Sequence, residues 1–212
     1  MNNVGQIFEN SKGVGEFSSG YIAYLSKVLA SINVQEIERF VDILLDARER
    51  GANIFFIGNG GSASTASHFV NDIGVGSRSW DKPFCVMSLT DNSSVVTAIG
   101  NDRGYENIFV EQLRLYLKPD DVVVLITASG NSPNLVKAVD YANDVGAITV
   151  GLTSFDGGVV RERSRFGIHV PAEKGEYGPA EDAHLVIDHL VSAYLMHHVR
   201  LEKLENERNR SV

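Results

Sequence analysis

Short runs of consecutive apolar residues alternate with helical patterns through most of this 212-residue chain. Uninterrupted apolar runs bounded by glycine and small polar residues are typical of strands that are covered on both faces. We expect such strands at 54–58, 84–89, 121–127 and 147–153, with a weaker one at 167–171. Segments with helical spacing lie between them, at 62–75, 93–99, 106–117 and 132–145. This alternation predicts βαβ units, and hence a three-layer α/β/α sandwich around a parallel sheet of about five strands.

Further helices are predicted at both ends of the sandwich. An amphipathic segment from Tyr21 to Ile32 predicts one helix, and Asn33 is a favourable N-cap for a second, from Val34 to Arg50. Gly51 would end it. A last helix runs from about Pro179 to Leu204. We expect three parts in the chain: an N-terminal extension (1–20), a single domain (21–204) and a charged tail (205–212).

The composition narrows the classes of function. The chain has 19 Lys and Arg against 27 Asp and Glu, a formal net charge of -8 and no basic run, which argues against a nucleic-acid partner. Its apolar runs are too short to cross a bilayer and its first residues resemble no secretory signal, so we expect no membrane partner. Cys85 is the single cysteine and its mid-strand position predicts burial. A cytoplasmic location is the simplest expectation.

Two of the turns that follow strands are rich in glycine and hydroxyl groups. One reads GNGGSA at 58–63 and the other TASGNSP at 127–133. The carboxyl ends of parallel strands share one edge of a sheet, so we expect both turns on that edge. Helix N-termini and neutral hydroxyls bind anions, and the absence of a P-loop lysine argues against a nucleoside triphosphate. The turns therefore predict a site for one phosphate monoester, formed by Ser62, Thr127, Ser129 and Ser132.

Two other interpretations of these turns stay open. The serines could serve only as N-caps, which helices need in any case. The first turn also fits the loose G-x-G-x-x-A form of a dinucleotide-binding fingerprint. That fingerprint calls for an acidic ribose ligand after the second strand, roughly 20 residues on, where this chain has GSRSWDKP.

Polar residues recur on two otherwise apolar helices. His68 and Asp72 are four residues apart and share a helix face, which suits two ligands of one metal ion. On the last helix Glu181 and His189 lie roughly 80° apart around the axis, while His184 and Asp188 lie on its other flank. Buried polar groups cost several kcal/mol unless they are paired or bind a metal. A surface His–Asp pair and a solvated stripe are the alternatives.

Six motifs together resemble those of sugar isomerase (SIS) domains, and specifically the phosphoheptose isomerase family. They are GNGGSA (58–63), HFVND (68–72), AIGNDRGYENIF (98–109), TASGNS (127–132), GLTSFDGG (151–158) and EDAHLVIDHL (181–190). The likeness extends from about Tyr21 to Tyr194. It implies conversion of sedoheptulose 7-phosphate to a glycero-manno-heptose 7-phosphate, which supplies heptose for bacterial surface polysaccharide. It also implies a homotetramer with active sites between subunits and one zinc ion in each.

The resemblance also implies roles for particular residues. The substrate-binding set would comprise Asn59, Gly60, Ser62, Asn92, Asp102, Thr127, Ser129, Ser132 and Glu181. The metal set would comprise His68, Asp72, Glu181 and His189. His189 is the first candidate for acid–base work because imidazole titrates near neutrality, and Asp72 is the second.

The chain departs from the family pattern at three of these positions. The family usually has glutamate in place of Asp72 and glutamine in place of Glu181, and often has aspartate in place of Asn92. The shorter Asp72 weakens the case for proton transfer there, whereas Glu181 adds a negative charge that favours a bound cation. An isomerase of another phosphosugar therefore stays open. So does a non-catalytic SIS protein that binds a phosphosugar or serves as a scaffold for a replication initiator.

Overall fold

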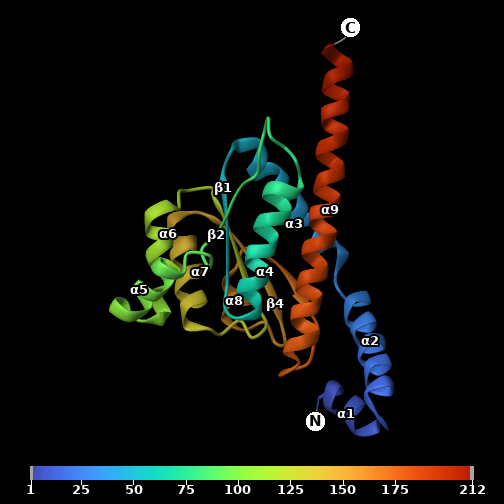
Figure 1. Ribbon diagram of the computed structural model, residues 1–212. Helices are drawn as coiled ribbons and strands as arrows, with labels where there is room; N and C mark the ends of the chain where they lie inside the picture. The colour runs from blue at the N-terminus through green and yellow to red at the C-terminus, as the bar shows by residue number, and fades with distance from the viewer. Residues whose placement is uncertain (1, 211–212) are drawn as a thin grey trace.

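The computed structural model describes residues 2–210, with Arg210 described in its backbone only. Its centre is a five-stranded sheet in the order β2-β1-β3-β4-β5, in which every neighbouring pair is parallel (Figure 1). The strands are β1 (Asn53–Gly58), β2 (Cys85–Ser88), β3 (Val122–Thr127), β4 (Ile148–Ser154) and β5 (Phe166–Val170). The predicted α/β/α sandwich with a parallel sheet is confirmed.

The continuous apolar runs are strands because helices cover both faces of the sheet. All six residues of β3 are buried. Its alternate side chains point into two separate cores, Val122, Val124 and Ile126 into one, and Val123 and Leu125 into the other. The alternation of direction along a strand explains why a single apolar run supplies two cores.

Each core is closed by its own set of helices. The first core contains side chains of α3, α4 and α9, and the second contains side chains of α6, α7 and α8. The helices of the first layer and its π-helical turn are α3 (Val34–Arg50), α4 (Gly61–Val70), η1 (Asn71–Gly76) and α9 (Tyr177–Arg210). Those of the second are α5 (Ser93–Arg103), η2 (Tyr105–Asn107), α6 (Val110–Tyr116), α7 (Pro133–Val145) and α8 (Gly158–Arg163).

Two further helices precede the sandwich, α1 (Asn3–Asn10) and α2 (Val14–Ala30). The sequence places the start of the α2 helix at Tyr21, but it begins seven residues earlier, at Val14. The glycines and serines of its first half conceal it, because these residues are weak helix formers. Both helices lie beside the start of α9 (Figure 1). The Tyr21 hydroxyl of α2 donates a hydrogen bond to Asp182 Oδ2 of α9, at 2.6 Å. Only Val28 of α2 is buried.

The predicted caps of α3 are confirmed. The Asn33 side chain accepts a hydrogen bond from the backbone N–H of Gln35, at 3.0 Å. Gly51 adopts the left-handed conformation, with φ of 65°, and ends the helix.

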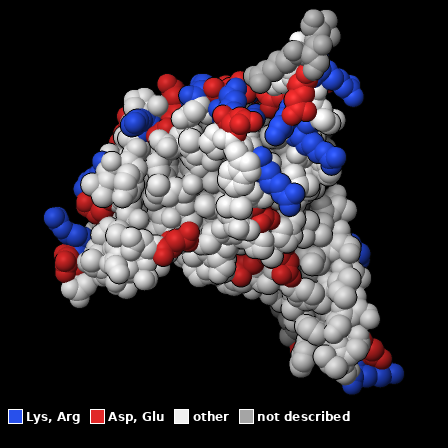
Figure 2. All heavy atoms as spheres, turned by 45° about the horizontal axis from the view of Figure 1, so that its top comes forward, with Lys and Arg blue, Asp and Glu red and all other residues white. Residues whose placement is uncertain are grey.

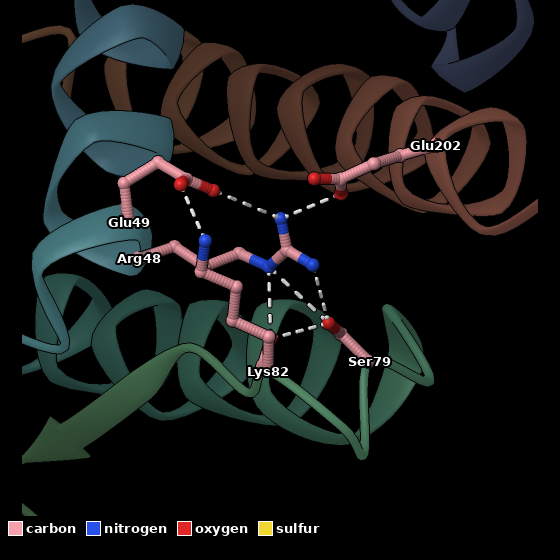
Figure 3. Close-up of polar contacts among 5 residues, drawn as sticks. All are labelled: Arg48, Glu49, Ser79, Lys82 and Glu202. Carbon is pink, nitrogen blue, oxygen red and sulfur yellow. Dashed lines mark hydrogen bonds and ion pairs between the residues drawn. The ribbon is translucent and has the colours of Figure 1, made fainter. Parts of the chain in front are cut away.

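Helix α9 has 34 residues and continues well beyond the sandwich (Figure 1). Arg48 of α3 links this extension to the loop before β2, as Figure 3 shows. The guanidinium donates to Glu202 Oε2 at 2.8 Å, to the carbonyl of Lys82 at 2.8 Å and to the Ser79 hydroxyl at 3.0 and 3.2 Å. The Arg48 side chain is 6% exposed, so these contacts replace water as its partners.

Two surface features complete the fold. The prediction that Cys85 is buried is wrong: it is exposed, because β2 is an edge strand. Acidic and basic side chains are interspersed around the C-terminal part of α9 rather than separated by sign (Figure 2). No helix within residues 2–210 is both long and apolar enough to span a membrane.

Candidate active site

The two glycine- and hydroxyl-rich turns lie next to each other, as the shared edge of the sheet predicts. Gly58 at the end of β1 pairs with Ile126 of β3, so the turns after these strands are neighbours. A reciprocal pair of side-chain hydrogen bonds joins them: Asn59 Nδ2 donates to Asn134 Oδ1 at 2.9 Å, and Asn134 Nδ2 donates to Asn59 Oδ1 at 2.8 Å. The Tyr105 hydroxyl also donates to Asn59 Oδ1, at 3.0 Å. The predicted sugar contact Asn59 is therefore held in place by two residues that the sequence analysis missed.

Helices α4 and α7 both start in these turns without a side-chain cap. Gly60 is the N-cap of α4 and has no side chain that could cap the helix. Ser132 is the N-cap of α7, and its hydroxyl forms no capping hydrogen bond. The interpretation of Ser132 as merely a capping residue therefore fails. Uncapped N–H groups at two adjacent helix starts form a natural site for an anion.

The other predicted phosphate residues differ in their surroundings. Ser62 and Thr127 are both buried, each 5% exposed. Thr127 Oγ1 accepts from the backbone N–H of Gly130 at 3.1 Å, which folds the second turn back on itself. Gly130 has φ of 67°, and a Cβ on it would lie 1.8 Å from the carbonyl oxygen of Gly157. Only glycine fits this position, where the turn packs against the loop after β4.

Asn92 and Asp102 lie at the start and near the end of α5. Asn92 caps α5, since its side chain accepts from the backbone N–H of Val95 at 3.2 Å. Asp102 lies on the same helix and is exposed. Figure 1 shows α5 well away from α9. The segment that follows α5 contacts the glycine-rich turn through the hydrogen bond of Tyr105 to Asn59.

His68 and Asp72 lie where α4 changes its winding. The helix runs to Val70 and continues as a π-helical turn, η1, that contains Asp72. Such turns are rare and frequently occur at functional sites, because the wider winding changes the direction of side chains. His68 Nε2 lies 3.5 Å from Asp72 Oδ2.

Helix α9 packs against α4 and η1 and adds two more residues to this pair (Figure 1). His189 Nε2 lies 3.2 Å from His68 Nε2, and the two rings meet edge to face with 4.9 Å between centroids. Among the described residues, His68, Asp72, Asp188 and His189 each offer a ligand atom within 4.8 Å of the others. We call these four residues the His–Asp cluster. His189 is exposed, whereas Asp188 is buried.

The buried face of α9 carries two titratable groups with displaced pKa values. Burial, together with the nearby Asp72, raises the pKa of Asp188 to about 8. Burial lowers the pKa of His184 to about 4, against a weaker opposing effect of the Thr153 backbone. Neither ring nitrogen of His184 forms a hydrogen bond of normal geometry within the described chain. His184 is thus a neutral histidine inside the core.

Comparison with known proteins identifies the family. The family described as "SIS domain" matches residues 17–154. The phosphoheptose isomerase of Geotalea daltonii is 36% identical over 168 residues, covering 78% of this chain and 86% of its own. That of Akkermansia muciniphila is 37% identical over 166 residues, with the same coverage. This chain belongs to the phosphoheptose isomerase family of SIS-domain proteins.

The fold agrees with this family. The solved structure of the phosphoheptose isomerase from Neisseria gonorrhoeae superposes with a TM-score of 0.79 at 26% identity, covering 86% of this chain and 98% of that one. The resemblance inferred from the six motifs is confirmed.

Glu181 lies apart from the His–Asp cluster. It is not one of the four clustered residues, and a Cβ on Gly61 would lie 2.2 Å from Glu181 Oε2. Its carboxylate therefore faces the start of α4, beside the glycine-rich turn. Burial, with a contribution from Asp182, raises the pKa of Glu181 above its usual range.

Proposed function

We propose that this chain is an aldose–ketose isomerase that converts sedoheptulose 7-phosphate to D-glycero-D-manno-heptose 7-phosphate. The observation that carries the proposal is the placement of two sites along α4. The helix begins at the uncapped glycine-rich turn and reaches His68 and the His–Asp cluster about 10 Å further on. A sugar that carries its phosphate at one end and its carbonyl near the other needs such a separation between the phosphate-binding turn and the residues that transfer protons.

The hydroxyl-rich turns would bind the phosphate. Ser62, Thr127, Ser129 and Ser132 would donate through hydroxyls, and the starts of α4 and α7 through backbone N–H groups. Asn59, Gly60 and Glu181 would contact the sugar next to this anchor, and Asn92 and Asp102 would do so from α5. Because α5 lies away from the cluster in one chain, we infer that Asp102 of one subunit serves the site of another.

The proton transfers would use His189 and Asp72. A ketose becomes an aldose when a base removes a proton from C1 and an acid returns one to C2, with an enediol between. His189 is exposed and can reach a substrate, and Asp72 lies beside it in the cluster. An acid at the carbonyl oxygen would stabilise the negative charge of the intermediate.

The cluster also fits a zinc ion, with His68, Asp72 and His189 among its ligands. Two imidazoles and a carboxylate within 4.8 Å form a donor set that zinc favours. A bound zinc ion would polarise the oxygens of the substrate. A ring nitrogen cannot bind an ion and accept a proton at once, so ligand and acid–base roles are alternative states of His189 and Asp72.

The assembly and the setting follow the same family. We propose a homotetramer in the cytoplasm that supplies heptose for surface polysaccharide, with one domain over 21–204 flanked by the segments 1–20 and 205–212. Residues 3–10 and 14–20 are helical, and α9 continues through the tail to Arg210; Met1 and residues 211–212 lie outside the described chain.

The direct test is turnover of sedoheptulose 7-phosphate by the purified protein, with the aldose product identified by NMR. We expect catalytic conversion in both directions. Binding of the sugar without conversion would instead indicate a phosphosugar-binding protein, and conversion of a different phosphosugar alone would indicate a side branch. Capture of a replication initiator without turnover would indicate the scaffold function.

The phosphate anchor has its own test. Ser129→Ala removes one hydroxyl donor far from the proton transfers, so we expect a rise in KM of about tenfold with kcat little changed. A fall in kcat without a change in KM would place Ser129 at the reacting carbons rather than at the phosphate.

A further inference from the structure

The two helices before the sandwich, α1 and α2, which we call the N-terminal lobe, meet a buried carboxylate at the entrance to α9. Glu176 directly precedes α9 and is 2% exposed. Its Oε1 accepts from the backbone N–H of Val4 in α1 at 3.2 Å, and its Oε2 accepts from the Tyr24 hydroxyl of α2 and from the backbone N–H of Glu173. A carboxylate removed from water needs several such donors. The N-terminal lobe is therefore joined to the start of α9 by specific polar contacts.

The first turn of α9 is a weak helical segment by its sequence. It begins with Tyr177, Gly178 and Pro179. Glycine loses more backbone entropy than other residues in a helix, and proline has no N–H to donate. The Tyr177 ring lies edge to face with Phe155 from the loop after β4, with 5.1 Å between centroids. The position of this turn thus depends on contacts made from outside the helix.

Tyr21 of α2 supplies such a contact across the first two turns of α9. Its hydroxyl donates to Asp182 Oδ2 at 2.6 Å. A Cβ on Gly178 would lie 2.8 Å from the same hydroxyl oxygen, so the hydroxyl fits against the helix only because this residue is glycine. Gly178 and Asp182 are four residues apart and lie one above the other on the same face of α9. A single side chain of the N-terminal lobe therefore holds both turns (Figure 1).

Glu181 leaves the same part of α9 in another direction. It precedes Asp182 by one residue, which is a rotation of about 100° around the helix axis. Its carboxylate faces the start of α4, where a Cβ on Gly61 would lie 2.2 Å from Glu181 Oε2. Neighbouring residues of a helix keep a fixed angle to each other because backbone hydrogen bonds set the winding. The bond that holds Asp182 therefore also sets the direction of Glu181.

We propose that Tyr21 is a positioning residue for the substrate, which acts through Asp182 to direct the Glu181 carboxylate at the glycine-rich turn. The N-terminal lobe would then contribute to sugar binding although Tyr21 does not touch the sugar. The inference rests on the proposed function, in which Glu181 contacts the sugar next to the phosphate. Two tests separate it from that function, one without any sugar and one with it.

The first test measures amide hydrogen exchange in the peptide 180–186 by mass spectrometry of the full chain. Tyr21→Phe keeps the ring and removes the hydroxyl, so we expect exchange there to become about fivefold faster, the effect of one lost hydrogen bond. The matched control is Tyr24→Phe, which removes a hydroxyl from the same helix. Glu176 keeps the N–H groups of Val4 and Glu173 as donors in this variant, so exchange in the peptide should stay within about twofold of the parent.

The second test measures the dissociation constant of sedoheptulose 7-phosphate by titration calorimetry. We expect Tyr21→Phe to raise it about fivefold with kcat little changed, and Asp182→Ala to do the same because it removes the acceptor of the bond. Asp182→Asn keeps an oxygen that can accept, and it should retain most of the affinity.

A double-mutant cycle shows whether Tyr21 acts through Glu181. In a Glu181→Ala background, Tyr21→Phe should cause no further loss of affinity, because the side chain that it directs is gone. A purely structural role of Tyr21 would instead give the same loss in both backgrounds.

Three outcomes would overturn the proposal: unchanged affinity in Tyr21→Phe, an equal loss with and without Glu181, or hydrogen exchange at 180–186 that Tyr21→Phe leaves unchanged. A parent protein that converts the sugar but shows no coupling between Tyr21 and Glu181 would contradict this inference alone. A parent protein that shows the coupling in affinity but does not convert the sugar would contradict the proposed function alone.

Discussion

At the scale of single residues, the inner face of α9 carries titratable side chains that are buried from water. His184 is 0% exposed and forms no hydrogen bond of normal geometry within the described chain. Its pKa of about 4 lies below the ordinary value of 6.5, so the folded protein keeps the ring neutral where the unfolded chain protonates it. This residue therefore makes stability depend on pH.

The sign of that dependence is fixed by the direction of the shift. Above pH 6.5 both states carry a neutral ring and His184 adds no pH dependence. Below it the unfolded chain binds the extra proton, so stability falls as the pH drops from 6.5 toward 4. We therefore compare the free energies of unfolding of His184→Leu and the parent. The difference should shift in favour of the variant by about 2 kcal/mol between pH 7.5 and pH 5. Urea unfolding in the presence of a chelator measures this difference in stability. The same difference at both pH values would mean that His184 becomes protonated in the folded protein at pH 5.

His189 carries the proposed chemistry on the exposed side of the same helix. We predict that His189→Ala lowers kcat by about 10²-fold or more, because the variant loses the imidazole that transfers protons. His197→Ala is the control, since it removes an exposed imidazole farther along α9. Steady-state turnover of the sugar phosphate measures both, and near-parental kcat in His189→Ala would remove this residue from the mechanism.

At the scale of elements, much of the molecule follows from sequence pattern. The strands are predictable because an apolar run has few alternatives between two helical layers, and the caps of α3 because Asn33 and Gly51 satisfy its ends locally. The π-helical turn at Asp72 was not predictable, since periodicity assumes regular winding. Helical spacing puts Asp188 on another flank of α9 than His189, and only the packing of α9 against α4 and η1 shows that both lie near His68.

The turn after β3 provides a prediction at this scale. Gly130→Ala would place a Cβ 1.8 Å from a backbone oxygen at a position with φ of 67°, so we expect a loss of about 3 kcal/mol or more and weaker phosphate binding. Gly146→Ala is the matched control: its φ is 91°, but nothing lies within 4 Å of the added atom. It should cost only about 1 kcal/mol. Thermal and urea unfolding compare the two, and equal costs would show that the loop after β4 yields to the added methyl group.

At the scale of the whole molecule, several helices carry large apolar side chains that the chain itself leaves exposed. Phe8 on α1, Ile22 on α2, and Leu190 and Tyr194 on α9 are 48% to 68% exposed. The lobe formed by α1 and α2 is uncharged over most of its visible surface except near the tip (Figure 2). Apolar helix faces of this kind are typical of surfaces that pack against further copies of a chain.

Light scattering tests the proposed tetramer. We predict a mass four times that of the chain at micromolar concentration, and a smaller species for Ile22→Glu, because a charge would be buried in the contact. Leu115→Glu is the control, since Leu115 is 72% exposed on α6 in the other layer. A monomeric parent protein would contradict the proposed assembly and the sharing of Asp102 between subunits.

The central claim is that phosphate-binding turns hold a sugar whose carbonyl end reaches the His–Asp cluster for proton transfer. Deuterium NMR of sedoheptulose 7-phosphate incubated with the protein in D2O tests it most directly. We predict that solvent deuterium enters the sugar at the carbons that exchange protons, C1 of the ketose and C2 of the aldose, and that His189→Ala suppresses this incorporation. A sugar phosphate that binds tightly but takes up no deuterium with the parent protein would contradict the account.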